Sequence, residues 1–365
     1  MKKILFVEPY YGGSHREFLD GLKSHSAHDV DCVTLPALNW NWRMNASAVY
    51  LALRDIPFHA YDVIITTGML RLSDLKALSG SDFPPVLVYF HETQLTYPLA
   101  QGEKRDPALC MADISTALCA DRVLFNSSFH RETFLQSVTQ FMDRAPDYPA
   151  IGLVERIRNK SGFLYPGMDF HGIDDSVCIS DNKRPLVIWN HRWSYDKNAA
   201  SFFYALETMV KRGVDFELAL LGECTEQRLP EIFQRAKERL GDRIVQFGYV
   251  QDKKDYFRWL EKGTVVVSTA RQENFGMAMV EAMRYGCLPL MPGRLSYPEI
   301  LPRRFHGHFL YANQAEFLEK MHFMLTEGKA YSHLVNDLAL SMETFSWKRL
   351  IDDYDLEIER LSSMR

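Results

Sequence analysis

Short apolar runs alternate with amphipathic segments along this chain, and no other feature restricts its fold as strongly. The runs ILFV (4–7), DVIIT (62–66) and VLVYF (86–90) have the length and the β-branched content of strands buried on both faces. The segments between them repeat their apolar residues with helical period. Strands and helices in alternation predict parallel sheets covered by crossover helices, which is an α/β fold.

The alternation occurs twice, so we predict two Rossmann-like domains. In the first block the predicted strands span 4–7, 30–35, 62–66, 86–90 and 122–125, and the helices lie near 14–25, 44–54, 70–78, 107–119 and 128–141. In the second block strands are predicted at 186–189, 216–221, 243–248, 264–268 and 287–291, with helices near 197–211, 229–240, 253–262 and 276–285. Three more helices, without strands between them, are predicted near 313–326, 330–342 and 346–363.

Glycines and prolines interrupt this pattern over residues 161–185, which we interpret as a linker. The N-terminal domain is therefore expected over 1–165 and the C-terminal domain over 183–343. Residues 344–365 are expected to pack back on the N-terminal domain and complete it.

The composition is that of an ordinary globular protein without bulk attraction for nucleic acid. Hydrophobic residues make up 47% and charged residues 24% of the 365 positions, and the formal net charge is -5. Both halves are mildly acidic, so RNA contacts have to come from local patches such as Arg156, Arg158 and Lys160. Glu8 interrupts the apolar start and no run is long enough to span a bilayer, so we expect a cytoplasmic protein without a membrane partner.

No residue pattern predicts a metal or a redox cofactor. The six cysteines are scattered without the spacing of metal ligands. The Asp pairs at 29–31 and 353–355 fall at the opening of a strand and on a polar helix, and neither position suits a cation. G-x-G-x-x-G spacing is absent, which disfavours a nicotinamide cofactor. We therefore predict that the protein uses neither.

The segment E-N-F-G-M-A-M-V-E, Glu273 to Glu281, is the most informative motif. It follows the predicted strand at 264–268 and opens a predicted helix, where backbone N–H groups favour an anion such as a diphosphate. Gly276 permits a ligand to approach the backbone closely. Two solvated glutamates on an amphipathic helix are the alternative interpretation. We favour a donor-binding site formed by Glu273, Asn274, Phe275, Gly276 and Glu281.

The segment W-N-H-R-W-S-Y-D-K follows the predicted strand at 186–189 and supplies two cations. Negative charge accumulates on a diphosphate leaving group, and fixed cations stabilise it where no metal is present. Arg192 offers a planar guanidinium and Lys197 a point charge at a helix start. Solvent-exposed cations are the alternative, although the helix dipole disfavours them there unless an anion is bound. We predict that both residues contact donor phosphates.

Polar residues also follow several strands of the first block. In Y-Y-G-G-S-H, Gly12 and Gly13 form a tight turn, Ser14 is placed to cap a helix, and His15 has the character of a surface residue. Ligands bind at the carboxyl ends of strands in open α/β sheets, which is where F-H-E-T-Q-L-T-Y-P (90–98) lies.

Within this segment His91 is placed to contact the transferred sugar or the acceptor hydroxyl. Glu92, Gln94 and Tyr97 are placed to shape an acceptor pocket, and Asn126 follows the next strand in the same way. A structural loop with a capped helix is the equally weighted alternative.

Aromatic residues and a cation occur together in L-P-A-L-N-W-N-W-R-M, residues 35–44. Such a combination can stack on a base or on a sugar face. A place in the core is the competing interpretation, and we expect it for at least one of Trp40 and Trp42. We include Trp42 and Arg43, with His15, among the predicted acceptor contacts.

Taken together, these motifs resemble one family of enzymes. Residues 273–281 are similar to the Glu-x7-Glu signature of retaining GT-B glycosyltransferases. Further blocks spread over nearly the whole chain resemble the tRNA-queuosine mannosyltransferases: Y-G-G-S-H at 11–15, W-x-W-R at 40–43, F-H-E-x-Q-L-x-Y-P at 90–98, F-N-S at 125–127, H-R-W-x-x-D-K at 191–197 and Y-P-E-I at 297–300.

The resemblance implies a GT-B fold in which an N-terminal acceptor domain and a C-terminal donor domain face a central cleft. It implies that Glu273 contacts the donor sugar, that Glu281 binds the nucleotide ribose, and that Gly12 and Gly13 approach the donor phosphates. It also implies transfer of mannose from GDP-mannose to queuosine in the anticodon of tRNA-Asp, with retention of configuration. We expect His91, Glu273, Arg192 and Lys197 to take part in catalysis.

Three alternatives stay open from the sequence. A retaining GT-B enzyme with another donor or with a small-molecule acceptor fits the same motifs. A nucleotide-sugar 2-epimerase shares the two-domain build and requires no acceptor. A non-catalytic binding module is the third, although the intact charged motif residues argue against it.

Overall fold

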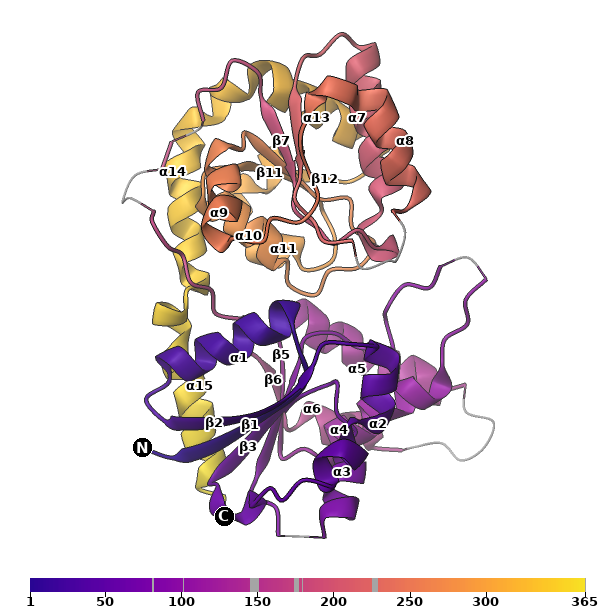
Figure 1. The fold of residues 1–365 in the computed structure, drawn as a ribbon, viewed down its shortest axis with the longest axis vertical. Coiled ribbons are helices and arrows are strands. Elements are labelled where there is room, and N and C mark those ends of the chain that lie inside the picture. The colour runs from indigo at the N-terminus through magenta and orange to yellow at the C-terminus, as the bar shows by residue number, and fades with distance from the viewer. Residues whose placement is uncertain are drawn as a thin grey trace. The chain divides into compact units, whose positions relative to one another are not determined.

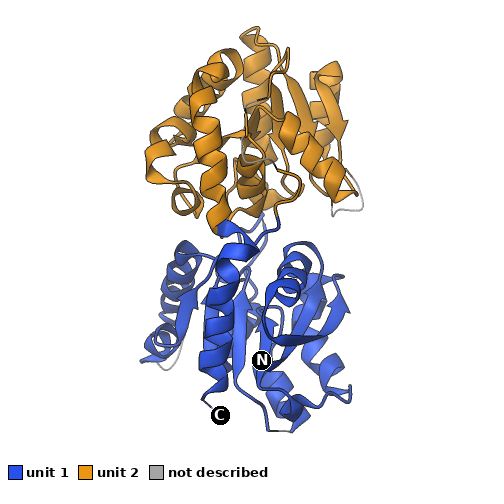
Figure 2. Cartoon of the chain, turned by 90° about the vertical axis from the view of Figure 1, so that its left-hand side faces the viewer, with its two compact units in different colours: residues 1–169, 345–365 blue, residues 170–344 orange. Residues whose placement is uncertain are grey.

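The chain forms two compact units in a computed structural model that describes residues 1–80, 82–100, 102–144, 151–173, 177–178, 180–224 and 229–364 (Figure 2). Unit 1 comprises Met1–Asp169 together with Phe345–Arg365, and unit 2 comprises Phe170–Thr344. The predicted linker is partly wrong, because its first residues form a strand at Ser161–Phe163. Residues 174–176 and 179 of that segment lie outside the described residues.

Unit 1 is built on a parallel sheet of six strands (Figure 1). The strands are β1 (Lys3–Tyr11), β2 (Asp29–Pro36), β3 (Val63–Thr67), β4 (Val86–Phe90), β5 (Arg122–Phe125) and β6 (Ser161–Phe163). Their order across the sheet is β2-β1-β3-β4-β5-β6, and every pair of neighbours is parallel. The five strands predicted for this block are confirmed, whereas β6 escaped prediction.

Helices cover both faces of this sheet. They are α1 (Gly13–His25), α2 (Trp40–Ala52), α3 (Leu72–Ser79), α4 (Pro107–Cys119), α5 (Ser128–Met142), α6 (Leu153–Arg158) and the C-terminal α15 (Trp347–Ser362). One core cluster packs α1 and α15 against one face of the sheet. A second core cluster packs the five helices from α2 through α6 against the other face. Trp347 is almost fully buried in the first cluster, where a side chain at Gly21 or Gly167 would overlap its indole.

Unit 2 is built on a second parallel sheet of six strands. The strands are β7 (Leu186–Trp189), β8 (Glu217–Leu220), β9 (Ile244–Phe247), β10 (Val265–Val267), β11 (Leu288–Pro292) and β12 (Leu310–Tyr311), in the order β12-β11-β10-β7-β8-β9. The helices are α7 (Ala199–Lys211), α8 (Glu231–Leu240), α9 (Lys253–Lys262), α10 (Met277–Arg284), α11 (Tyr297–Ile300), α12 (His306–Phe309), α13 (Gln314–Glu327) and α14 (Ser332–Ser341).

Each sheet has one point where the order of its strands reverses, and these points locate the candidate sites. The reversal lies between β1 and β3 in unit 1 and between β7 and β10 in unit 2. Crossover connections leave in opposite directions there, which opens a crevice at the carboxyl ends of the two strands where ligands bind. Within the part of the chain that the structure describes, no helix has both the length and the apolar character needed to cross a membrane.

Candidate active site

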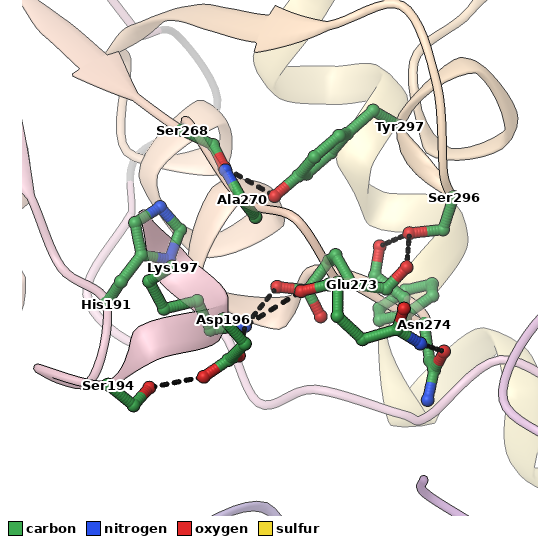
Figure 3. A network of polar contacts seen from close by, with 12 residues as sticks. His191, Ser194, Asp196, Lys197, Ser268, Ala270, Glu273, Asn274, Ser296 and Tyr297 are labelled. Atoms are coloured by element: carbon green, nitrogen blue, oxygen red, sulfur yellow. Dashed lines mark hydrogen bonds and ion pairs between the residues drawn. The ribbon is translucent and has the colours of Figure 1, made fainter. Parts of the chain in front are cut away.

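The carboxyl ends of β7 and β10 bring a lysine and a glutamate from distant sequence positions into contact (Figure 3). Lys197 ends a short 3-10 helix (Tyr195–Lys197) after β7, and Glu273 lies in the loop between β10 and α10. The Lys197 Nζ atom is 3.0 Å from Glu273 Oε2 and 3.1 Å from Asp196 Oδ2. We call these three residues the Lys197 cluster.

Lys197 remains a cation in this cluster despite its burial. Burial by itself lowers the pKa of an amine, but the charges of Glu273 and Asp196 outweigh it and raise the pKa of Lys197. For Asp196, burial raises the pKa, and the Lys197 charge with the Ser194 hydroxyl overcomes that effect and lowers it. Lys197 and Asp196 therefore remain charged at neutral pH, and the positive charge of Lys197 is available to an anion.

Arg192 places a second positive charge near the Lys197 cluster. Its side chain is exposed, and its charge acts on both Asp196 and Lys197. The preceding residue, His191, is buried with Nε2 3.2 Å from the Val267 carbonyl, and burial lowers its pKa to about 4. Arg192 and Lys197, both predicted to bind phosphate, are thus together at this strand end, beside a neutral imidazole.

Glu281, the second glutamate of the motif, lies on α10 and contacts α9. Its Oε2 atom accepts a hydrogen bond of 2.8 Å from the Tyr256 hydroxyl. The Asn190 side chain donates to the same hydroxyl oxygen at 2.9 Å. Burial, and then the charge of Glu281, raises the pKa of Tyr256 well above its ordinary value, so the phenol keeps its proton and remains a donor. These contacts fix the orientation of Glu281.

The loop that carries Glu273 has a fixed backbone. Gly276 precedes α10 with φ of +106°, a conformation that L side chains rarely adopt. The Ser296 hydroxyl lies 3.2 Å from the Glu273 carbonyl oxygen and 2.8 Å from that of Phe275 (Figure 3). The Gln272 side chain donates to Asn274. The predicted donor residues 273–276 therefore form one ordered loop beside the Lys197 cluster.

A buried polar network lies at the carboxyl end of β1 in unit 1. Glu8 is fully buried, with Oε2 3.1 Å from Nδ1 of His15 and Oε1 accepting from the Thr67 hydroxyl and the Tyr10 amide. The His15 ring packs on that of His91, with centroids 4.2 Å apart. The expectation of a surface position for His15 is wrong, because Glu8 holds it inside the unit.

His91 lies at the end of β4 as a neutral imidazole. Burial, reinforced by the charges of His15 and His130, lowers its pKa well below 6.5. The Asn126 side chain donates to the His91 carbonyl at 2.9 Å, and its oxygen lies 2.8 Å from Nδ1 of His130. Asn126, which we predicted as an acceptor contact, therefore positions the backbone of His91.

The segment after β4 lines a small pocket in unit 1. Asp113 of α4 is 1% exposed and accepts hydrogen bonds of 2.7 Å from the Thr93 hydroxyl and the Gln94 amide. Burial is the main cause that raises the pKa of Asp113 to about 7; these hydrogen bonds oppose it and the charge of Glu92 adds to it. The pocket is lined by His15, Met44, Gly68, Met69, His91, Glu92, Gln94 and Asp113.

The rest of this segment is braced by an arginine. Arg105 donates to the carbonyl oxygens of Gln94 and Tyr97, the second at 3.0 Å. Tyr97 itself is half-buried, outside the set of residues that line the pocket. The structure thus brings the predicted residues His15, His91, Glu92 and Gln94 together and leaves Tyr97 beside them.

Gly12 and Gly13 form the turn from β1 into α1. Gly13 has φ of +52°, and a side chain at Gly12 would overlap Ala37. The expected Ser14 cap is wrong: α1 begins at Gly13, and its N-cap residue is Gly12 without a side-chain hydrogen bond.

The predicted aromatic contacts lie on the surface of unit 1. Trp40 and Trp42 are 45% and 61% exposed, so the expectation that at least one belongs to the core is wrong. The Trp42 indole donates to the Tyr50 hydroxyl at 2.8 Å, and the Arg43 guanidinium lies 5.9 Å from the Tyr50 ring centre. Smaller residues, Met44, Ser47, Ala48 and Leu51, form the buried face of α2 instead.

Several polar residues of these sites were missed from the sequence, among them Glu8, Asp113, Asn190 and Tyr256. Glu8 and Asp113 had a signal, because each is a carboxylate inside an otherwise apolar segment. Asn190 and Tyr256 had none, since their contact with Glu281 depends on strand order. Across the described ranges, no group of three or more His, Cys, Asp or Glu side chains could hold a metal ion.

Solved structures share this architecture over the full length of the chain. Sucrose-phosphate synthase from Thermosynechococcus elongatus superposes with a TM-score of 0.73 at 15% identity, covering 100% of both chains. HepE from Anabaena, in complex with UDP-glucose, superposes with a TM-score of 0.67 at 14% identity, again covering 100% of both chains. Two Rossmann-like units of this kind define the GT-B fold, and the chain has that fold.

Comparison of sequences narrows the class to a family. Residues 3–168 match the family model described as tRNA-queuosine alpha-mannosyltransferase N-terminal, and residues 184–327 match that of glycosyl transferases group 1. The tRNA-queuosine alpha-mannosyltransferase of Drosophila melanogaster is 37% identical over 311 residues, which cover 82% of each chain. The chain belongs to the tRNA-queuosine alpha-mannosyltransferase family.

Proposed function

We propose that this enzyme transfers mannose from GDP-mannose to queuosine in the anticodon of tRNA-Asp, with retention of configuration, and that it acts in the cytoplasm. The observation that carries the catalytic part of the proposal is the Lys197 cluster, which places one fixed cation between two carboxylates at the switch point of unit 2. Queuosine in tRNA as the acceptor is supported by the 37% identity to a protein named for tRNA-queuosine, and the choice of tRNA-Asp is what the family resemblance implies.

Unit 2 has the groups that a nucleotide-sugar donor requires. We assign the diphosphate to Arg192 and Lys197, because both cations follow β7. Their positive charges are already in place when negative charge develops on the leaving group. Glu273 then accepts hydrogen bonds from sugar hydroxyls, and Glu281, held by Tyr256, accepts from the ribose. Main-chain groups of the loop at 274–276 complete the donor contacts.

The reaction requires no protein nucleophile in this scheme. The acceptor hydroxyl attacks the anomeric carbon on the same face as the departing diphosphate and gives its proton to a phosphate oxygen. The carbon–oxygen bond to the diphosphate breaks, and configuration is retained. His91 is neutral and is suited to hydrogen-bond the transferred sugar or the attacking hydroxyl rather than to act as a charged group.

Unit 1 supplies the acceptor contacts. The pocket lined by His15, His91, Glu92 and Gln94 is assigned to the modified base. The exposed Trp42, with Arg43 beside Tyr50, is assigned to RNA, because aromatic rings next to a cation stack well on unpaired bases.

Mass spectrometry of tRNA nucleosides tests the proposal directly. Queuosine-containing tRNA-Asp is incubated with the enzyme and GDP-mannose, UDP-glucose or UDP-galactose, then digested. We expect a hexose adduct of queuosine with GDP-mannose only. An adduct with another donor would correct the sugar, whereas isomerisation of a donor without tRNA would overturn transfer in favour of epimerisation.

A further inference from the structure

Two carboxylates at the unit 1 pocket lack a cation. Glu92 is half-buried and makes no hydrogen bond or ion pair with any residue that the structure describes. Asp113 is 1% exposed and uses only Oδ2, which accepts from Thr93 and Gln94; its Oδ1 accepts from nothing within the described ranges. The two lie close enough for the charge of Glu92 to act on Asp113.

No basic side chain of the described chain compensates this charge at the pocket. The lining residues include no lysine or arginine, burial keeps the His91 imidazole neutral, and His15 has its Nδ1 atom 3.1 Å from Oε2 of Glu8. The nearby Arg105 donates to backbone carbonyls of the same segment. Burying a carboxylate without a partner is costly, and a ligand that brings a cation recovers that cost on binding.

We propose that Glu92 and Asp113 bind a protonated secondary amine of the acceptor, namely the amine that links the base of queuosine to its cyclopentenediol ring. This proposal rests on the proposed function. A secondary ammonium has two N–H donors and no acceptor, so it can give one hydrogen bond to Glu92 and one to Asp113 Oδ1. Charge-assisted bonds of this kind are short and strong, and they discriminate against guanosine, which has no amine at that position.

The substrate class is thereby restricted by charge as well as by shape. A neutral substituent on the base leaves Glu92 and the Oδ1 atom of Asp113 without a hydrogen-bond donor, and sites with unsatisfied polar groups reject such analogues strongly. The diol of the same ring carries the hydroxyls that can accept mannose. Recognition of the amine therefore fixes the position of the attacking group in relation to His91, which lines the same pocket.

The test combines one protein variant with modified ligands. Glu92→Gln removes a charge but breaks no contact with the described residues, and Asp55→Asn removes an exposed charge elsewhere in unit 1 as the matched control. The probes are queuosine nucleoside, its N-methyl derivative, which keeps the charge, and its N-acetyl derivative, which loses it. Affinity is measured by titration calorimetry for the full-length wild type and both variants.

We expect Glu92→Gln to weaken binding of queuosine by about tenfold or more, the range of one hydrogen bond to a charged group, and Asp55→Asn to have no effect. N-acetylation should weaken binding to the wild type much more than binding to Glu92→Gln, with N-methylation intermediate. Equal losses in wild type and variant would overturn the proposal, because the amine and Glu92 would then not be coupled.

Steady-state kinetics separate this inference from the proposed function. With queuosine-containing tRNA, Glu92→Gln should raise KM about tenfold or more, while GDP affinity stays at the wild-type value. Normal mannosylation with an unchanged KM in the variant would refute amine recognition alone. Absence of mannosylation by the wild type would refute the proposed function, and the nucleoside titrations would still decide the role of Glu92.

Discussion

At Lys197, burial and the neighbouring negative charges have opposite effects on the pKa of the side chain. A buried amine tends to lose its proton, but two carboxylates within about hydrogen-bond distance hold the proton on Lys197. A donor diphosphate approaching this cluster meets a cation whose present partners are Glu273 and Asp196. We infer that donor binding exchanges part of the Lys197–Glu273 contact for contacts of each residue with the ligand.

Replacing Lys197 tests this view. Lys197→Met keeps the length of the side chain and removes its charge, so we expect kcat to fall about 100- to 1,000-fold, as on loss of one group that stabilises transition-state charge. The exposed Lys211→Met on α7 is the control and should leave kcat unchanged. Turnover of Lys197→Met within twofold of the wild type would contradict the assignment of the diphosphate.

Asp113 leads to a second prediction at the scale of residues, which concerns how the free energy of unfolding depends on pH. Its pKa rises from 3.8 to about 7 on folding, so between these values the folded chain binds more protons than the unfolded chain. The contribution of this carboxyl group to the free energy of unfolding is therefore complete below about pH 4 and is lost as pH rises through 7. Asp113→Asn does not titrate, so its stability relative to the wild type should increase from pH 4 to 7 and stay constant above.

Denaturation in urea at several pH values, with Asp55→Asn as the control, measures this difference. A difference between Asp113→Asn and wild type that is independent of pH would show that Asp113 titrates normally. The comparison of two chains at each pH removes the effect of the buried histidines, whose lowered pKa values destabilise both chains equally in acid.

At the scale of elements, both candidate sites lie at the ends of strands, and a glycine determines the course of the loop at the site in unit 2. The switch point of unit 2 places the loops after β7 and β10 side by side, although about 75 residues separate them in sequence. Gly276 then turns the second loop into α10 with a positive φ. A Cβ there would also lie 3.3 Å from Ile300 and 3.4 Å from Tyr297.

Gly276→Ala should therefore affect both stability and donor binding. A non-glycine residue in this backbone region costs about 1–2 kcal/mol, and displacement of the loop should move Glu273. Gly213→Ala is the matched control, since Gly213 has φ of +76° in the same unit without a neighbour within 4 Å. We expect urea melts to show similar losses for both variants and GDP titration to show weaker binding for Gly276→Ala alone.

Most elements were predictable because their apolar periods are long enough to be read. Ten strands at their predicted places and most of the helices follow from local pattern, whereas the short helices α6, α11 and α12 were not predicted. β6 and β12 were not predictable, because three residues containing a glycine and two residues at a sheet edge have no period of their own. Tertiary pairing with β5 and with β11 creates these strands.

The candidate site was predictable only in part, for a related reason. Motif spacing located Arg192, Lys197 and Glu273, since each follows a strand that the pattern identifies. The partners of these residues depend on which strands are neighbours and on how deeply a side chain is buried. His15 and Trp42 illustrate this: one was expected at the surface and is buried, and the other belongs to an exposed pair although its type favours the core.

At the scale of the whole molecule, the chain leaves unit 1, forms unit 2 and returns to complete unit 1 with its last helix (Figure 2). The buried face of α15 repeats at helical spacing and comprises Trp347, Leu350, Tyr354, Ile358 and Leu361. Tyr354 donates to the carbonyl of Tyr165, and Glu357 pairs with Arg122 through both carboxylate oxygens. Unit 2, in contrast, is one continuous segment.

Removal of residues 345–365 should therefore unfold unit 1 and spare unit 2. Burial of five large side chains contributes on the order of 10 kcal/mol, which is comparable to the whole stability of a typical domain. Hydrogen exchange followed by mass spectrometry should show rapid exchange in β1 and β4 and continued protection in β7 and β10 of the truncated chain. A Trp347→Ala variant of the full chain should show a smaller loss, about 3–5 kcal/mol, confined to unit 1.

A synthetic peptide of residues 345–365 distinguishes loss of a structural element from general misfolding. Added to the truncated chain, it should restore protection in β1 and β4, because the face that α15 covers is formed by α1 and strands of unit 1. A peptide in which Trp347 is alanine should restore less, since the indole fills the space left by Gly21 and Gly167. Full protection of unit 1 without any peptide would contradict the view that the last helix is part of its core.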